Sequence, residues 1–311
     1  MTAVGSGLVE IVREFMIAHR LLRRVTERYR AGRLAFDEVG ELVGDDERSV
    51  LFRLKERTHA LFRGESVIGP AALFDLAVGS LFHEAMKFRE NFYQRSAYGP
   101  KVQALRKAAV HDASGLLPEF EKLLAGAALR IEESLQELDT LLVQTTAQFR
   151  VLLEAHAREG AVARALVARG TELAEVLGGT ADELFAALYG DVASAWVAAG
   201  RSLLESGFYA EAVEALENAS RGGREEASLE AYARGMRAYL AARYETAACE
   251  LMAWLDTSPD PLPDAEHGLA QAAGAALARV EALAGTDSPA AAQAARALEQ
   301  LRARAPGAAL L

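Results

Sequence analysis

The spacing of apolar and polar residues is helical along most of the chain. Near the start, one face carries Leu8, Val12, Phe15, His19, Leu22 and Tyr29, with Ile11 and Val25 beside them. A stripe of this width is typical of an amphipathic helix that packs on a core. The pattern predicts one long helix over residues 6–31. A short acidic helix and turn are expected next, followed by a further helix over residues 49–63.

Two later segments carry apolar residues in alternating steps of three and four. The first seam consists of Phe74, Val78, Leu81, Ala85, Phe88 and Phe92. The second consists of Leu124, Ala128, Ile131, Leu135, Leu138, Leu142, Thr145, Phe149 and Leu152. Such spacing is typical of coiled coils, so the two seams predict an antiparallel helical hairpin. Either seam could instead pair with a second copy of the chain, which leaves a homodimer open.

The tripeptide Tyr98-Gly99-Pro100 follows the first seam. A proline disfavours the helical conformation of the residue before it. We therefore expect the helix to end or bend at this point.

A short repeat occupies the C-terminal part of the sequence. Its first copy contains Trp196, Gly200, Leu203, Gly207, Tyr209, Ala212, Leu216 and Ala219 within one predicted helix-turn-helix. A weaker copy about 35 residues later contains Ala231, Gly235, Ala238, Ala242, Tyr244, Ala247 and Leu251, with Pro259 at its end. In this order and spacing, residues 191–259 resemble a tandem tetratricopeptide repeat.

The resemblance implies a concave groove that receives an extended peptide or a helix of a partner protein. By position, the groove residues are Val197, Arg201, Leu204, Tyr232, Met236 and Tyr239. This set lacks the ring of Lys and Asn with which chaperone-binding members hold a C-terminal carboxylate, so an apolar or amphipathic helix suits it better. For any single aromatic residue here, burial in the core is the favoured interpretation.

These patterns together predict an all-α fold. We expect an N-terminal helical bundle with coiled-coil-like hairpins over residues 1–160, followed by a tetratricopeptide-like α-solenoid segment over residues 161–311. Composition agrees, because the chain is 51% apolar and holds only eight prolines and 7% aromatic residues.

The formal net charge of −10 disfavours nucleic acid as a partner, because the chain repels phosphates at long range. One basic patch departs from this balance and consists of Arg20, Arg23, Arg24 and Arg28. We expect these arginines to pair with the acidic segment 37–47, while docking of an acidic partner, nucleic acid or anionic lipid stays open. A DNA-binding helix-turn-helix over residues 36–63 would use Arg48, Arg53, Lys55 and Arg57, but its turn is acidic.

Cys249 is the only cysteine, which excludes an internal disulfide and favours a reducing, cytoplasmic location. No run approaches ~18 uninterrupted apolar residues, so no membrane span is expected. The sequence also lacks a phosphate loop, a nucleophile elbow, a dinucleotide fingerprint and a zinc-binding helix. His83, Glu84 and Glu90 share a helix, but Lys87 stands where a second histidine would be needed.

We therefore predict a protein that is not an enzyme and carries neither metal nor cofactor. Its expected role is that of an adaptor or scaffold that binds another protein through the groove and the helical bundle. The alternative is a transcriptional or sensory regulator, with a DNA-contacting N-terminal bundle and repeats that sense a ligand or peptide. A bundle enzyme with an acid/base pair that no motif reveals is a third class.

Overall fold

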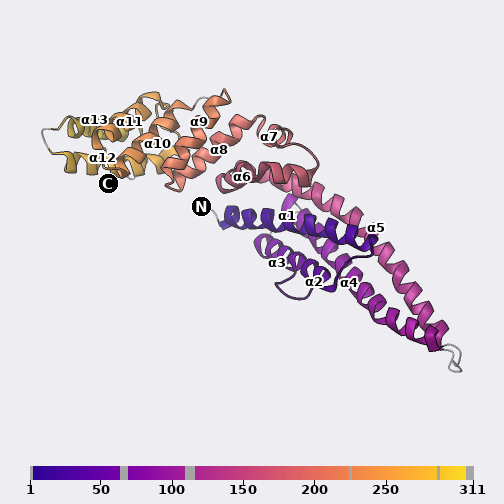
Figure 1. Cartoon of the computed structure of the whole chain (residues 1–311). Coiled ribbons are helices and arrows are strands. Elements are labelled where there is room, and N and C mark those ends of the chain that lie inside the picture. Colours follow the sequence, from indigo (N-terminus) through magenta and orange to yellow (C-terminus); the bar gives the residue numbers. More distant parts are fainter. Residues whose placement is uncertain (1–2, 64–68, 109–115, 224–225, 286–287, 306–311) are drawn as a thin grey trace. The chain divides into compact units, whose positions relative to one another are not determined.

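The computed structural model describes residues 3–63, 69–108, 116–223, 226–285 and 288–305, and the regular structure within these ranges is helical (Figure 1). The first helices are α1 (Ala3–Arg30), α2 (Phe36–Leu42), α3 (Val50–Phe62), α4 (Pro70–Ala108), α5 (Leu116–His156), α6 (Gly160–Leu177) and α7 (Ala181–Tyr189). The later ones are α8 (Val192–Glu205), α9 (Tyr209–Arg221), α10 (Ala227–Leu240), α11 (Tyr244–Thr257), η2 (Asp264–Glu266), α12 (His267–Ala284) and α13 (Pro289–Arg304). The predicted all-α fold class is confirmed.

The chain forms two compact units. The N-terminal unit comprises residues 7–155 and 172–179, and the C-terminal unit comprises residues 1–6, 156–171 and 180–311. Helix α6 contributes residues to both, and its backbone leaves the helical region at Arg169. The domain boundary at residue 160 therefore stays a prediction.

The core of the N-terminal unit is a cluster of phenylalanine rings from three helices. The ring centroids of Phe15 in α1 and Phe149 in α5 lie 4.2 Å apart, and Phe74 in α4 lies 5.7 Å from Phe15 and 5.5 Å from Phe149. Aromatic side chains remove a large apolar area from water, so this cluster ties the three helices together. All three rings are fully buried.

Helices α4 and α5 pack against one another in opposite directions. The Thr145 hydroxyl lies 3.5 Å from the Ala77 carbonyl, and Arg130 Nε lies 2.8 Å from the side-chain oxygen of Asn91. Moving forward along α4 thus means moving backward along α5. The first seam is buried throughout and the second is buried from Ile131 onward, so both face the interior of a single chain.

Helix α4 does not end at Pro100 but continues to Ala108. We expected the helix to end or bend at this tripeptide, and of these the end was wrong, for a reason that lies in Gly99. The ring of a proline clashes with the N–H and the Cβ atom of the preceding residue, and glycine has no Cβ atom. Gly99 therefore allows the helical conformation that another residue would resist.

The C-terminal unit contains two helical hairpins, α8–α9 and α10–α11, with matching contacts. A Cβ atom on Gly200 would lie 2.8 Å from Cδ2 of Leu216, and one on Gly235 would lie 2.8 Å from Cγ of Leu251. These pairs occupy equivalent positions about 35 residues apart. In both hairpins, a glycine lets the leucine of the second helix lie directly on the backbone of the first.

The turns of the two hairpins also match. Gly207 has a φ of 79° and the equivalent Ala242 has a φ of 55°. The N–H of Phe208 donates to the Leu203 carbonyl at 2.9 Å, and that of Arg243 donates to the Ala238 carbonyl at the same distance. The second hairpin thus keeps a left-handed turn without the glycine that favours it.

We expect Leu138→Lys to unfold the N-terminal unit, because Leu138 is 0% exposed and a buried unpaired charge costs at least about 3 kcal/mol. Leu129→Lys is the matched control on the same helix, since Leu129 is 62% exposed and its change should stay within ~0.5 kcal/mol. Circular dichroism during urea unfolding measures both. If the wild type were a dimer and Leu138→Lys a folded monomer, the seam would lie between two chains and not inside one.

We expect Ala242→Gly to stabilise the C-terminal unit by about 0.5 to 1 kcal/mol, because glycine removes the strain of a positive φ. The adjacent Ala241→Gly should instead lower stability, since Ala241 has a φ of −84°. Both tryptophans, Trp196 and Trp254, belong to this unit, so tryptophan fluorescence follows its unfolding. Equal effects of the two substitutions on the stability of this unit would contradict the positive φ of Ala242.

Candidate functional site

The six predicted groove residues do not share one open surface. Leu204, Tyr232 and Met236 are 2%, 0% and 5% exposed and belong to the core of the C-terminal unit. Tyr239 packs against the same core and is partly buried. In this conformation, these three side chains cannot contact a partner protein. Val197 is also buried, at 7% exposed, and Arg201 is exposed.

Helix α12 packs against both α8 and α10, and its apolar side chains belong to the same buried core. Tyr232 in α10 packs edge-on against Trp254, with ring centroids 5.1 Å apart, and burial raises the pKa of its hydroxyl above the ordinary value. Tyr232 is thus a core residue here.

Val197 and Arg201 line a cleft of about 340 Å³ in the C-terminal unit. Helix α8 contributes Ser194, Val197, Ala198, Arg201, Ser202 and Glu205. The rest of the lining is Arg158 just before α6, Gly160 at the start of α6 and Tyr189 at the end of α7. This volume lies at the lower end of the range for ligand sites.

Two local features place the cleft walls. A Cβ atom on Gly160 would lie 2.3 Å from the Cβ of Ser202, so only glycine lets the start of α6 approach α8 this closely. The Tyr189 hydroxyl donates to the Ala157 carbonyl at 2.8 Å, which fixes the end of α7 against the segment before α6. The sequence pattern does not reveal the cleft, because the contact between Gly160 and Ser202 joins segments distant in sequence.

The cleft carries mixed charge. Arg158 and Arg201 are cationic and Glu205 is anionic, so the lining has a formal charge of +1. Arg201 also forms an ion pair with Glu226 at 3.9 Å. The chain as a whole is strongly acidic, so this surface is a local exception that favours an acidic group on a ligand.

Glu266 in η2 is 6% exposed and its Oε2 atom lacks a hydrogen-bond partner within the described part of the chain. Burial raises the pKa of this carboxyl above its ordinary value. The positive charge of Arg201 opposes the rise and the negative charge of Glu226 adds to it. Glu266 thus couples the start of α12 electrostatically to α8.

Two of the four arginines in the basic patch on α1 form ion pairs within their own unit. Arg20 pairs with Glu172 at 3.3 Å and with Glu175 at 3.7 Å, and Arg28 forms an ion pair with Glu38. The expected pairing with the acidic segment is confirmed for Arg28, which lowers the pKa of Glu38. Arg23 and Arg24 are exposed on the same helix.

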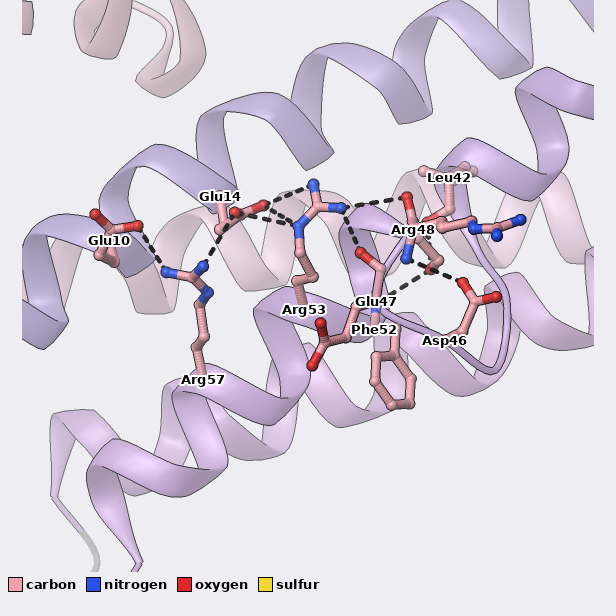
Figure 2. Close-up of polar contacts among 10 residues, drawn as sticks. Glu10, Glu14, Leu42, Asp46, Glu47, Arg48, Phe52, Arg53 and Arg57 are labelled. Carbon is pink, nitrogen blue, oxygen red and sulfur yellow. Dashed lines mark hydrogen bonds and ion pairs between the residues drawn. The ribbon is translucent and has the colours of Figure 1, made fainter.

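Helix α3, the recognition helix of the DNA-binding alternative, directs two arginines onto α1 (Figure 2). Arg53 Nη2 lies 3.1 Å from the buried Glu14 carboxylate, and Arg53 Nη1 donates to the Glu47 carbonyl at 2.7 Å. Arg57 Nη1 donates to Glu10 at 2.6 Å. These contacts neutralise cationic groups that contact with phosphates would require.

Two of the three candidate metal residues on α4 accept hydrogen bonds from neighbouring side chains. Glu84 accepts from Lys87 Nζ at 2.9 Å, and Glu90 accepts from Gln94 Nε2 at 3.3 Å. His83 and Glu90 also line a pocket with Lys87 and Arg89. No group of three or more His, Cys, Asp or Glu side chains suited to a metal ion occurs among the described residues. Within the same ranges, no helix combines the length and apolarity needed to cross a bilayer.

We expect Glu266→Gln to stabilise the C-terminal unit increasingly as pH rises. A raised pKa favours the protonated carboxyl in the fold, so its contribution is full below about pH 4.3 and is lost as pH passes the folded-state pKa. Tryptophan fluorescence during urea unfolding at several pH values measures the difference. Asp264→Asn is the control, because Asp264 is fully exposed on the same turn. If the stability difference between the wild type and Glu266→Gln did not change with pH, the carboxyl of Glu266 would not be buried without a compensating charge.

No protein-family model, no curated protein and no solved structure matches the chain. We therefore infer its function from its own residues and contacts.

Proposed function

We propose that the chain is a non-catalytic adaptor that binds a partner protein at the α8 cleft. The observation that carries the proposal is the cleft itself, formed by α6, α7 and α8 and lined by Val197 and Arg201 of the predicted groove. The helical bundle of the N-terminal unit would supply a second contact surface. This role follows the resemblance to tetratricopeptide repeats.

The matching hairpins support the repeat part of the proposal. Gly200 against Leu216 and Gly235 against Leu251 repeat one packing solution, and the two left-handed turns repeat another. Stacked helical hairpins of this kind bury their apolar faces on one another and expose elongated surfaces for binding.

The chemistry of the cleft indicates the partner segment. Val197 and Ala198 offer a small apolar floor, and Arg158 offers a cation at the rim. A short amphipathic segment with one apolar side chain and an acidic side chain about one helical turn away would satisfy both. The proposal thus favours a helical or extended peptide over a large folded surface.

The alternative of a DNA-contacting regulator has less support. The pairing of Arg53 with Glu14 and of Arg57 with Glu10 occupies the helix that would enter a groove of DNA. A gel shift at several salt concentrations separates the two functions, because phosphate contacts weaken steeply as salt rises. A specific, salt-sensitive complex with DNA would favour the regulator.

We expect Arg158→Glu and Ala198→Glu each to weaken partner binding at least about tenfold, because they place negative charge in the cleft. Binding is followed by affinity purification of cross-linked complexes from an extract, with quantitative mass spectrometry. Arg302→Glu is the matched control, since Arg302 lies exposed on α13.

The proposal requires one protein to be lost from both cleft variants and retained by the control. Recovery of the bare chain alone would contradict it. Equal loss from the cleft variants and from Arg302→Glu would place the contact elsewhere on the chain. Tryptophan fluorescence of each variant during thermal unfolding shows whether the C-terminal unit is still folded.

A further inference from the structure

The N-terminal unit contains a pocket of about 450 Å³ that the adaptor function does not use. It lies among the end of α1, the start of α2, and helices α4 and α5. Its apolar walls are Tyr29, Leu34, Phe36, Phe92, Pro100 and Leu124. This volume and this aromatic lining are typical of sites for small organic molecules.

Two aromatic rings of the pocket pack edge to face, and one of them remains exposed. The ring centroids of Phe36 and Phe92 lie 5.3 Å apart at an interplanar angle of 61°, and Phe36 is 54% exposed. Phe36 is the first residue of α2 and stands beside the pocket with much of its ring in contact with solvent. A planar ring that packs on Phe36 would cover this exposed face.

Arg95 supplies the charge of the pocket. Within the described residues, the lining carries this one cation and no carboxylate, although Glu132 interacts with the Tyr29 hydroxyl from outside the lining. The Arg95 guanidinium donates to the Tyr29 hydroxyl and lies 5.4 Å from the centre of its ring. A guanidinium has five N–H donors, and this bond uses one of them, so a planar anion can take a bidentate pair.

Helix α4 adds polar groups on the same side. Ser96, Gly99, Pro100 and Gln103 line the pocket at successive helical positions. Pro100 has no N–H, so it cannot donate to the Ser96 carbonyl as an ordinary residue of the helix would. This carbonyl can accept from a ring N–H of a ligand, and the Gln103 amide can donate to a ligand oxygen.

We propose that this pocket binds a planar aromatic carboxylate, with the ring packed on the exposed face of Phe36 and the carboxylate on Arg95. The exposed Phe36 ring favours a flat ring, and the single cation selects an anion. A ring N–H, as in an indole, would in addition satisfy the Ser96 carbonyl. Such a ligand would join α1, α2 and α4 around one bound molecule.

The test uses the full chain with indole-3-carboxylate and its uncharged isostere, indole-3-carboxamide, in isothermal titration calorimetry. We expect the acid to bind at least about tenfold tighter than the amide, because a charge-assisted hydrogen bond outweighs a neutral one by roughly this factor. Arg95→Gln should remove the preference. Arg106→Gln is the matched control, because Arg106 lies farther along α4 and pairs with Glu121 of α5.

A second variant checks the location. Ser96→Leu places a larger apolar side chain in the pocket and should abolish binding of both compounds, while Ser80→Leu on the same helix should not. Circular dichroism confirms that the variants are folded, and the comparison of acid with amide in the wild type needs no variant.

Three results would overturn the proposal. The first is that the acid does not bind or binds no better than the amide. The second is that the preference for the acid survives in Arg95→Gln. The third is that a tryptophan-containing peptide binds where the free acid does not, which would assign the pocket to a protein partner.

Discussion

The C-terminal unit depends on the close approach of paired helices at Gly200 and Gly235. Each glycine faces a leucine of the following helix at a distance that a Cβ atom would not permit. Because protein interiors pack as densely as organic crystals, this contact fixes the spacing of each hairpin. The positions of α8 and α10, and with them the cleft and the core beneath α12, follow from that spacing.

The same principle operates at the cleft, with a different outcome. Gly160 allows the start of α6 to meet Ser202, while the Tyr189 hydroxyl holds the segment before α6 in place. In the hairpins the close approach of two helices fills space, whereas here it leaves a cleft beside α8. A rigid, partly polar opening of this kind suits recognition of a short segment.

Much of the fold could be predicted because its signals are local. The phenylalanines and leucines of both seams recur with helical spacing, and the glycine and leucine pairs of the hairpins recur about 35 residues apart. The site could not be predicted equally well. The burial of Tyr232 and Met236 depends on how the helices of the C-terminal unit pack into one core, and the cleft depends on a contact between Gly160 and Ser202. Periodicity within a segment carries no information about such contacts between distant segments.

The most direct test of the account is photo-cross-linking from the cleft. A photoreactive amino acid in place of Ala198 in α8 should cross-link a partner protein in cell extract, because this side chain lines the cleft and is partly exposed. The same amino acid in place of the exposed Arg302 should not. Cross-links of equal yield from both positions, or from neither, would contradict a partner bound at α8.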